Sequence, residues 1–294
     1  GNIFVSLDKP DKEKNNNKIK DVKFVPGSIK FNFSDSECYM ETMAWAIKAI
    51  EKLGAKGILK GYTDKSFKPQ NKITNLEAMS LLLELAGKKN EVKNSDEILK
   101  FLNEYQKHWN LKWGLDSIVL AVKEGILLKE EVKGFNPNQP VKRHEFAKYL
   151  IRAIGETKAA GKAMDNKLEF KDAKDIPASS RGYVYMANEL GLMTGADGGK
   201  FKPNEPLSRA EIAVIIDRAE ILLEGDDAGN EEGIVFVSYD NKTNKIKVND
   251  NGVIKTYDAL ENVPVCIDYK YYRVNSGVLE AGDLLELVFN ASGD

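Results

Sequence analysis

The sequence predicts a mainly α-helical protein that ends in a small all-β domain. One pattern of residues occurs three times between residues 57 and 211, and apolar residues around it recur at helical spacing. After residue 232 the apolar residues instead follow the pattern of short strands. The 294 residues, 42% of them hydrophobic, suffice for a short repeat array and one additional domain.

The repeated pattern aligns in three copies without gaps. The copies start at Gly57, Gly125 and Gly191, which are 68 and 66 residues apart. In each copy a Phe follows the Gly by ten residues, a Pro follows the Phe by two, and a Glu follows the Phe by ten. The Gly stands where a helix would end in the left-handed conformation. Each copy is therefore predicted to contain a helix, a ten-residue loop, a Pro-bearing turn and a second helix.

The first helix of each copy lies upstream of its Gly. Trp45 and Trp113 precede that Gly by twelve residues in copies 1 and 2, whereas copy 3 has Ser179 at this position. Between the Trp and the Gly, apolar side chains recur at the spacing of one helix face.

The second helix of copies 1 and 3 begins with a capping signal. Thr74 with Glu77, and Ser208 with Glu211, have the spacing of a capping box, in which each side chain accepts the other residue's backbone N–H. Lys142 occupies the cap position of copy 2 and cannot accept a hydrogen bond. That helix start is expected to be weaker by about 1 kcal/mol.

These motifs resemble the S-layer homology (SLH) family of bacterial surface proteins. The family pattern combines an aromatic-x-Asp start, a helix led by Trp, paired glycines, Phe-x-Pro and a Thr-Arg-Ala-Glu type of helix start. The matching residues are Phe33-Ser34-Asp35, Phe170-Lys171-Asp172, Trp45, Trp113, Gly57 with Gly61, Gly191 with Gly195, and Ser208-Arg209-Ala210-Glu211. The resemblance covers roughly residues 33 to 224, and it is specific because three copies share one register.

The resemblance implies a fold, a ligand and a location. The three repeats would form a pseudo-threefold bundle with binding grooves between neighbouring repeats. The implied ligand is a secondary cell-wall polysaccharide that carries pyruvate ketals, and the implied location is extracellular, in the cell wall or S-layer of a bacterium. The carbohydrate-binding residues that it implies are Asp35, Trp45, Gly61, Trp113, Arg143, Asp172, Gly195 and Arg209.

The chemistry of such a ligand fits these residue types. A pyruvate ketal carries a carboxylate, which an Arg fork and free N–H groups at a helix start favour. An indole ring suits the apolar face of a sugar, and an Asp can accept sugar hydroxyls. Each type also has a structural interpretation: the Trp residues as core, the Asp residues as braces, the Arg residues as solvated first-turn residues, and the Glu residues as caps.

The three copies depart from the family pattern in different ways. Copy 1 has Asn75 where the family has Arg, so the positive charge is missing there. Copy 2 lacks an aromatic-x-Asp start, and copy 3 lacks the Trp. We therefore expect the grooves to be unequal.

The remaining segments complete the predicted domain order. Residues 95 to 109 should form an extra helix, interpreted as a strut, and Asp250-Asn251-Gly252 should form a hairpin turn. The short strands of the last segment suggest an SH3-like or OB-like barrel. The predicted boundaries are 1–33 for an N-terminal extension that fits a β-hairpin, 34–90, 91–155 and 156–224 for the three repeats, 225–232 for a linker, and 233–294 for the small β domain.

Composition argues against several functional classes. The net charge of −2, from 43 basic and 45 acidic residues, indicates no nucleic-acid partner. No apolar run is long enough for membrane insertion, and no catalytic or cofactor-binding motif occurs. The few Cys and His residues cannot assemble a zinc site, so no metal is expected. For Cys38 and Cys266, two lone buried thiols are favoured over a disulfide.

The sequence therefore predicts a non-catalytic anchor that binds pyruvylated cell-wall polysaccharide and tethers a surface or S-layer protein. The alternative is a structural lattice protein that acts mainly through contacts with other S-layer subunits. Neither function requires a cofactor.

Overall fold

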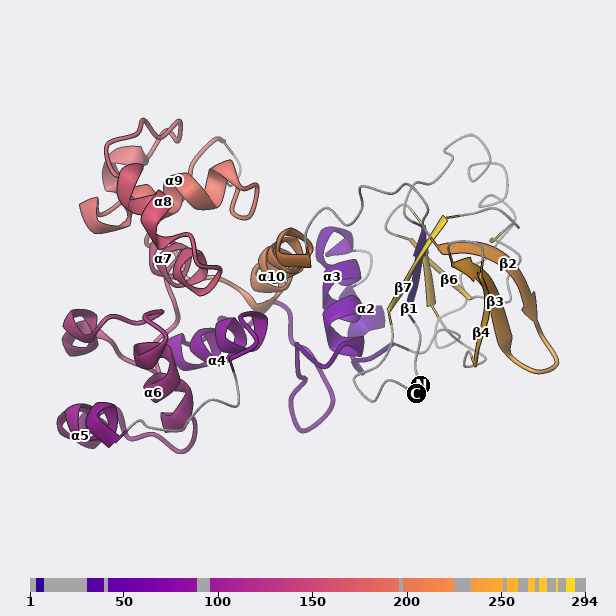
Figure 1. Cartoon of the computed structure of the whole chain (residues 1–294), viewed down its shortest axis with the longest axis horizontal. Coiled ribbons are helices and arrows are strands. Elements are labelled where there is room, and N and C mark those ends of the chain that lie inside the picture. The colour runs from indigo at the N-terminus through magenta and orange to yellow at the C-terminus, as the bar shows by residue number, and fades with distance from the viewer. Residues whose placement is uncertain are drawn as a thin grey trace. The chain divides into compact units, whose positions relative to one another are not determined.

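The computed structural model describes residues 4–7, 31–39, 42–88, 96–195, 198–224, 234–250, 253–258, 264–267, 270–273, 279 and 284–288. Between residues 36 and 224 the described residues are largely helical, and the strands after residue 233 belong to a mainly antiparallel sheet, which confirms the coarse fold class (Figure 1). It separates into two compact units. Residues 69–223 form the helical unit, and residues 1–68 with 224–294 form the mixed unit.

The helical unit contains the repeated helices in equivalent places. The second helices of the three copies are α4 (Asn75–Leu85), α7 (Arg143–Ala153) and α10 (Arg209–Glu224). The first helices of copies 2 and 3 are α6 (Leu115–Lys123) and α9 (Arg181–Glu189). The predicted extra helix is α5 (Asp96–Trp109). Shorter elements are η1 (Lys129–Gly134), α8 (Thr157–Lys162), η2 (Ala173–Asp175) and η3 (Ala178–Ser180).

Local sequence signals end and start these helices as predicted. Gly57, Gly125 and Gly191 have φ of 73°, 71° and 68°, which a residue with a Cβ rarely adopts. In both predicted capping boxes the hydroxyl accepts the Glu backbone N–H at 3.2 Å and the Glu carboxylate accepts the cap N–H at 2.8 Å. The Lys142 side chain makes no cap bond at the start of α7.

The apolar faces of the repeated helices form the core of the helical unit. α4 packs against α6 and α7, and α7 packs against α9. The loop residues Phe135 and Phe201 of copies 2 and 3 are buried with them. Residues at 0% exposure include Met79, Leu82, Ile118, Phe146, Leu150, Val184, Phe201, Ile212 and Ile216.

Backbone hydrogen bonds connect the three copies in a cycle. Each second helix donates the N–H groups of its first two residues to carbonyls of the Pro-bearing turn of another copy, so copy 1 bonds to copy 2, copy 2 to copy 3, and copy 3 to copy 1. The bonds are Asn75 to Gln139 (2.9 Å), Leu76 to Pro137 (3.0 Å), Arg143 to Glu205 (3.0 Å), His144 to Pro203 (3.1 Å), Arg209 to Asn71 (2.8 Å) and Ala210 to Pro69 (3.0 Å). These bonds hold α7 at its first residue although Lys142 does not cap it.

The mixed unit contains a seven-stranded sheet in the order β4-β3-β2-β7-β1-β5-β6. The N-terminal strand β1 lies between β7 and β5, antiparallel to the former and parallel to the latter. The barrel closure suggested for the C-terminal segment stays a prediction. The strands are β1 (Phe4–Leu7), β2 (Ile234–Asp240), β3 (Lys245–Asp250), β4 (Val253–Asp258), β5 (Pro264–Ile267), β6 (Lys270–Arg273) and β7 (Leu284–Val288).

Several predictions about this unit fall partly outside the described residues. The second strand expected for an N-terminal hairpin and the linker at 225–232 lie outside them, and β1 itself pairs with β5 and β7. Asp250 pairs with Val253 across β3 and β4, which is the register that a two-residue hairpin turn requires. The expectation that Cys38 is buried is wrong, because its thiol is free and exposed on α2 (Ser36–Tyr39), whose Ser36 and Tyr39 take the inner positions.

A buried carboxylate of α3 (Ala44–Ala55) forms hydrogen bonds with residues at the start of copy 1. Glu51 is 0% exposed, and its Oε2 accepts both the backbone N–H (2.6 Å) and the side-chain amide (2.9 Å) of Asn32. Its other oxygen bonds with the Ser36 hydroxyl. Burial raises the pKa of Glu51 to about 7, against the effect of these hydrogen bonds.

Candidate functional site

The two repeat tryptophans are surface residues. Trp45, in the first turn of α3, is 49% exposed, and Trp113, just before α6, is 56% exposed. Large aromatic side chains usually bury most of their area. The structure therefore rules out the core interpretation for both residues, and the same place in two copies presents an accessible indole ring.

The two aspartates of the aromatic-x-Asp motif brace the loops of their copies. The carboxylate of Asp35 accepts the backbone N–H groups of Phe67 (2.7 Å) and Lys68 (2.8 Å). Asp172 repeats this arrangement with Phe201 and Lys202 at the same two distances. Although burial opposes the shift, these N–H bonds lower the pKa of Asp172. Both carboxylates thus have backbone partners on both oxygens.

The second glycines of the family pattern leave room for an aromatic ring. A Cβ added to Gly61 would lie 3.0 Å from the Ser66 carbonyl oxygen and 3.1 Å from the Phe33 ring. A Cβ at Gly195 would lie 3.2 Å from the Phe170 ring. These glycines therefore serve the packing of the loop against the aromatic residue of the motif.

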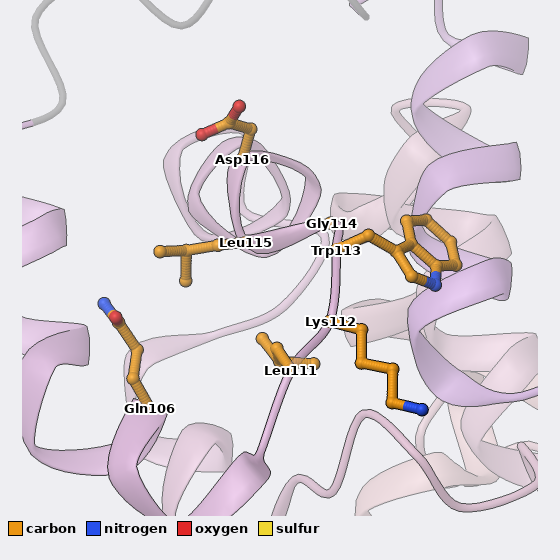
Figure 2. Close-up of a pocket in the computed structure, with 7 residues that line it drawn as sticks. All are labelled: Gln106, Leu111, Lys112, Trp113, Gly114, Leu115 and Asp116. Carbon is orange, nitrogen blue, oxygen red and sulfur yellow. The ribbon is translucent and has the colours of Figure 1, made fainter.

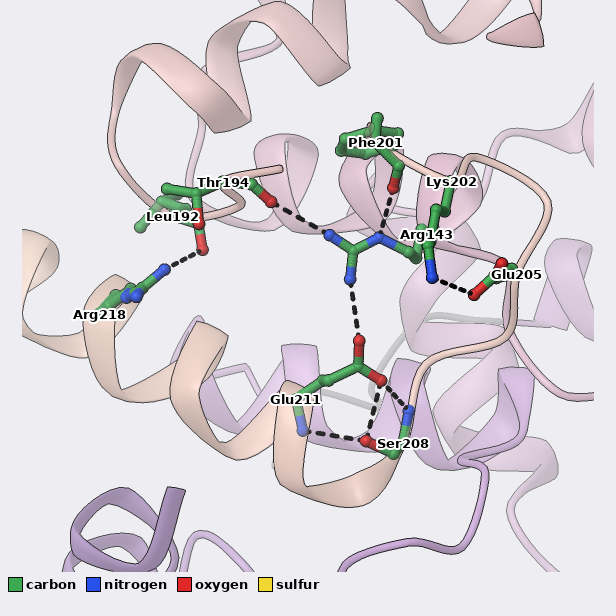
Figure 3. A network of polar contacts seen from close by, with 9 residues as sticks. All are labelled: Arg143, Leu192, Thr194, Phe201, Lys202, Glu205, Ser208, Glu211 and Arg218. Atoms are coloured by element: carbon green, nitrogen blue, oxygen red, sulfur yellow. Dashed lines mark hydrogen bonds and ion pairs between the residues drawn. The ribbon is translucent and has the colours of Figure 1, made fainter. Parts of the chain in front are cut away.

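Arg143 is a buried clamp between copies 2 and 3 (Figure 3). It is 7% exposed, and its guanidinium donates to the carbonyl oxygens of Phe201 (2.8 Å) and Thr194 (3.2 Å) and to Glu211 Oε1 (3.1 Å). The same guanidinium lies over the Phe201 ring, 5.2 Å from its centroid. We call the contact of α7 with residues 178–211 of copy 3 junction 2–3.

The premise that the helix starts offer free N–H groups to an anion is wrong. The first two N–H groups of α4, α7 and α10 donate to turn carbonyls of another copy. In α4 and α10 the third N–H donates to the capping hydroxyl. Tertiary contacts between copies use the groups that an isolated helix would leave open.

A second charged cluster at junction 2–3 was not found from the sequence. Arg152 donates to both oxygens of Glu131 (2.6 and 3.0 Å) and to the hydroxyl of Tyr183 in copy 3 (3.3 Å). Lys148 donates to Glu131 at 2.8 Å. Although burial alone would raise it, these bonds lower the pKa of Glu131 to about 2. The sequence feature that could have indicated this cluster is the four-residue spacing of Lys148 and Arg152, because residues four apart lie on the same face of a helix.

The histidine of copy 2 also contacts copy 3. His144 Nδ1 lies 3.0 Å from the Ser180 hydroxyl, and burial, with help from Lys148 and Lys142, lowers the pKa of His144 to about 4. His144 is therefore neutral at physiological pH and acts as a hydrogen-bonding residue of this junction.

The contact of the α4 start with residues 109–139, here called junction 1–2, has no guanidinium. Asn75 is 6% exposed, and its side-chain amide donates to the Asn136 carbonyl at 2.9 Å. Its Oδ1 is buried without a partner among the described residues. Trp109 Nε1 donates to the Phe135 carbonyl at 3.1 Å, whereas in junction 2–3 the corresponding Phe201 carbonyl accepts from Arg143.

Trp109 also replaces the aromatic residue of the missing aromatic-x-Asp start. Its ring centroid lies 5.9 Å from that of Phe135. The motif aromatics of the other copies, Phe33 and Phe170, lie 5.0 and 5.2 Å from the Phe of their loops. The last residue of the predicted strut helix is therefore part of the copy 2 core.

A pocket of about 350 Å³ adjoins Trp113 between α5 and α6. It is lined by Gln106, Leu111, Lys112, Trp113, Gly114, Leu115 and Asp116 (Figure 2). Figure 2 shows the Trp113 and Lys112 side chains on one side of the connection between the helices, and Leu115 and Gln106 on the other.

The remaining predicted residue, Arg209, is half-buried at the first position of α10, equivalent to Arg143 in α7. The predicted residues are divided between the units: Asp35, Trp45 and Gly61 lie in the mixed unit, and Trp113, Arg143, Asp172, Gly195 and Arg209 lie in the helical unit. Within the described residues no group of three or more His, Cys, Asp or Glu side chains is placed to hold a metal ion. None of the described helices is both long and apolar enough to cross a membrane.

Comparison with known proteins matches this chain to the S-layer homology domain at residues 40–79 and 169–213, which belong to copies 1 and 3. Three relatives illustrate its similarities. They are exoglucanase XynX of Acetivibrio thermocellus (28% identical over 58% of this chain and 15% of the relative), the surface-layer 125 kDa protein of Lysinibacillus sphaericus (27%, 59% and 14%), and the cellulosome-anchoring protein of Acetivibrio thermocellus (25%, 55% and 35%).

The chain spans about a third or less of the length of these relatives. Relatives that are named as enzymes and relatives that are named as surface or anchoring proteins therefore share only a part of their length with it. The matched family model and the repeated helix–loop–helix units lead to one assignment, namely that this chain carries S-layer homology domains at residues 40–79 and 169–213.

Proposed function

We propose that this chain is a non-catalytic anchor that binds pyruvylated secondary cell-wall polysaccharide and thereby tethers a surface or S-layer protein to a bacterial cell wall. The observation that carries the proposal is the exposure of Trp45 and Trp113 at the same position of two copies. An exposed indole offers a flat apolar face for a sugar ring, while its N–H is available to a hydroxyl. Relatives named as S-layer and cellulosome-anchoring proteins support the location.

The other predicted residues divide into those that hold the surface and one that contacts the ligand. Asp35, Asp172 and Arg143 have protein partners for their charged groups, so they position the loops and helix starts. Gly61 and Gly195 serve the same loops. We assign direct recognition of the pyruvate carboxylate to Arg209, because it lies half-buried at the first position of α10 and a planar guanidinium matches a carboxylate.

The arrangement of the repeats supports a rigid anchor. We infer that the three copies act as one pseudo-threefold bundle, with the cyclic backbone bonds as its physical basis. A bundle closed in this way presents its surface residues on helices and short loops, and such residues lose little conformational entropy on binding.

Binding to purified wall sacculi tests the anchor function. The chain should sediment with sacculi that retain their polysaccharide and stay in solution after acid has removed it. Trp113→Ala and Trp45→Ala should each weaken binding about ten-fold or more without lowering the melting temperature, because both rings are exposed. Equal sedimentation with intact and stripped sacculi would refute the proposal.

Recognition of the pyruvate requires a separate test. In calorimetry the wild-type chain should bind a pyruvylated wall oligosaccharide more tightly than the same sugar without its ketal. Arg209→Ala should lose this preference, and Arg209→Lys should retain part of it, because a point charge replaces a planar fork. If the wild type binds both sugars equally, the ligand is recognised through neutral contacts.

A structural lattice function is the second candidate, and strand β4 favours it. β4 forms one edge of the sheet, and its Val253 and Ile254 are each 58% exposed. An edge strand with apolar side chains can pair with another chain. Under this alternative, ordered sheets of the protein should assemble without any polysaccharide.

A further inference from the structure

We propose that Lys112 carries the anion-binding charge of junction 1–2 and, with Trp113, forms a subsite for a carboxylate-bearing sugar. The inference rests on the proposed function and identifies the residue whose positive charge contacts the carboxylate of the ligand at this junction. It follows from three features: the place of the Lys112–Trp113 pair, the rigidity of the backbone beneath it, and the residues at the equivalent places of junction 2–3.

The pair lies beside the start of α4, which has no arginine, unlike the starts of α7 and α10. A Cβ added to Gly114 would lie 2.7 Å from Leu76 Cδ1, so the residues just before α6 contact the first turn of α4. The equivalent contact at junction 2–3 joins Ser180 to His144. Trp113 and Lys112 therefore belong to the junction of Asn75, which is neutral and 6% exposed.

The backbone that carries the pair is fixed on both sides. Upstream, Trp109 donates its indole N–H to Phe135, and the Asn138 side chain donates to the Trp109 carbonyl at 2.5 Å. Downstream, Gly114 has φ of 81° and precedes α6 directly. Trp113 and Lys112 therefore project from a connection whose course does not depend on the ligand.

The two side chains suit a charged sugar. Trp113 is 56% exposed, and Lys112 is exposed beside it on the same side of the connection (Figure 2). Asp116 lines the same pocket, but Lys112 forms no ion pair with it or with any other residue in the described part of the chain. The indole can stack on the apolar face of the sugar while the ammonium group approaches its carboxylate.

The two junctions carry their positive charge at different positions of the repeat. The positions of Lys112 and Trp113 carry Ala178 and Ser179 in copy 3, at the junction where Arg143 is present. Arg143 is 7% exposed and uses its guanidinium on protein acceptors. Junction 2–3 therefore exposes neither a cation nor an aromatic ring at these places, and junction 1–2 exposes both.

Calorimetry on the full chain tests this assignment with an oligosaccharide released from wall polysaccharide, with and without its pyruvate ketals. Lys112→Ala should weaken binding of the pyruvylated form by about 3- to 10-fold and leave binding of the ketal-free form unchanged. The effect should shrink at high salt because the Lys112 ammonium is exposed. Lys112→Arg should bind nearly as the wild type does.

Lys107→Ala is the matched control, because Lys107 is also exposed, lies five residues away on α5, and loses the same charge. It should change affinity less than two-fold. If wild type binds the pyruvylated sugar but Lys112→Ala binds it equally well, the assignment of Lys112 is overturned and the anchor function stands. If Lys107→Ala matches Lys112→Ala, a diffuse positive field replaces the subsite. If the wild type binds neither sugar, both proposals fall.

Discussion

Junctions 1–2 and 2–3 use the same repeat in opposite ways. At junction 2–3 Arg143 and Arg152 are buried. Arg143 bonds to Glu211 and to carbonyl oxygens of copy 3, and Arg152, which is paired with Glu131 of its own copy, donates to Tyr183 of copy 3. At junction 1–2 the helix start is neutral, and the adjacent Lys112 and Trp113 face solvent. The comparison teaches that one motif position can either hold the array together or leave room for a surface contact, depending on the residue that occupies it.

Removing a whole copy should lower the stability of the chain more than any other change considered for the two junctions. A chain truncated after Gly155 loses the strands β2 to β7 and copy 3, and with copy 3 it loses the acceptors of the Arg143 and His144 backbone N–H groups and the donors to the turn of copy 1. The two remaining copies bury too little apolar surface to be stable alone. We expect loss of the cooperative thermal transition in circular dichroism, and a sharp melt of the truncated chain would show that junction 1–2 suffices.

Breaking the clamp of junction 2–3 should come next. Arg143→Ala leaves Glu211 and two carbonyl oxygens without their donor in a mostly buried place, and it should destabilise the chain by about 3–5 kcal/mol in urea unfolding. Asn75→Ala is the matched variant of junction 1–2. It should lower stability by about 1 kcal/mol, because the Asn75 side chain makes one hydrogen bond. Equal effects would contradict the contrast between the two junctions.

The free energy of unfolding should depend on pH in opposite directions for the carboxylate of Glu131, near junction 2–3, and for that of Glu51, at the start of copy 1. The pKa of Glu131 is lowered to about 2 from 4.5, so its stabilisation is present above pH 4.5 and is lost as the pH falls toward 2. The pKa of Glu51 is raised to about 7 from 4.5, so its contribution is present below pH 4.5 and is lost as the pH rises through 7. Each shift corresponds to about 3 kcal/mol.

Two variants check these opposite signs by urea unfolding at several pH values. Glu51→Gln should raise stability above pH 7 and change it little near pH 4, because an amide can keep the bonds to Asn32 and Ser36 without a buried charge. Glu131→Gln should remove part of the loss of stability between pH 4.5 and 2. A Glu51→Gln chain that is less stable than wild type at pH 8 would overturn the assignment for that residue.

The smallest expected effect concerns the caps. Lys142→Ser should stabilise α7 by about 1 kcal/mol by adding the hydroxyl that α4 and α10 already have, and Thr74→Ala should destabilise α4 by a similar amount. Thermal melts of the two variants give the measurement. If Lys142→Ser changes nothing, the backbone bonds from copy 3 already determine the start of α7.

Local features of the fold were predictable from the sequence because neighbouring residues determine them. The glycines at the helix ends, the two capping boxes and the register of the β3–β4 hairpin each depend on residues a few positions apart. The buried loop Phe residues followed from the same pattern. The expectation of exposed helix-start N–H groups failed because it treated each helix as isolated.

The sequence by itself determined the repeat, its helices and the resemblance to S-layer homology domains, since these are properties of spacing and residue type. Only the tertiary structure decided the roles of the charged and aromatic residues. Arg143 bonds with residues 51, 58 and 68 positions away, and no local rule specifies such partners. Likewise, Trp109 enters the core while Trp113, four residues later, stays at the surface. The physical reason is that burial depends on which other segments pack against a residue, and these segments lie far from it in the sequence.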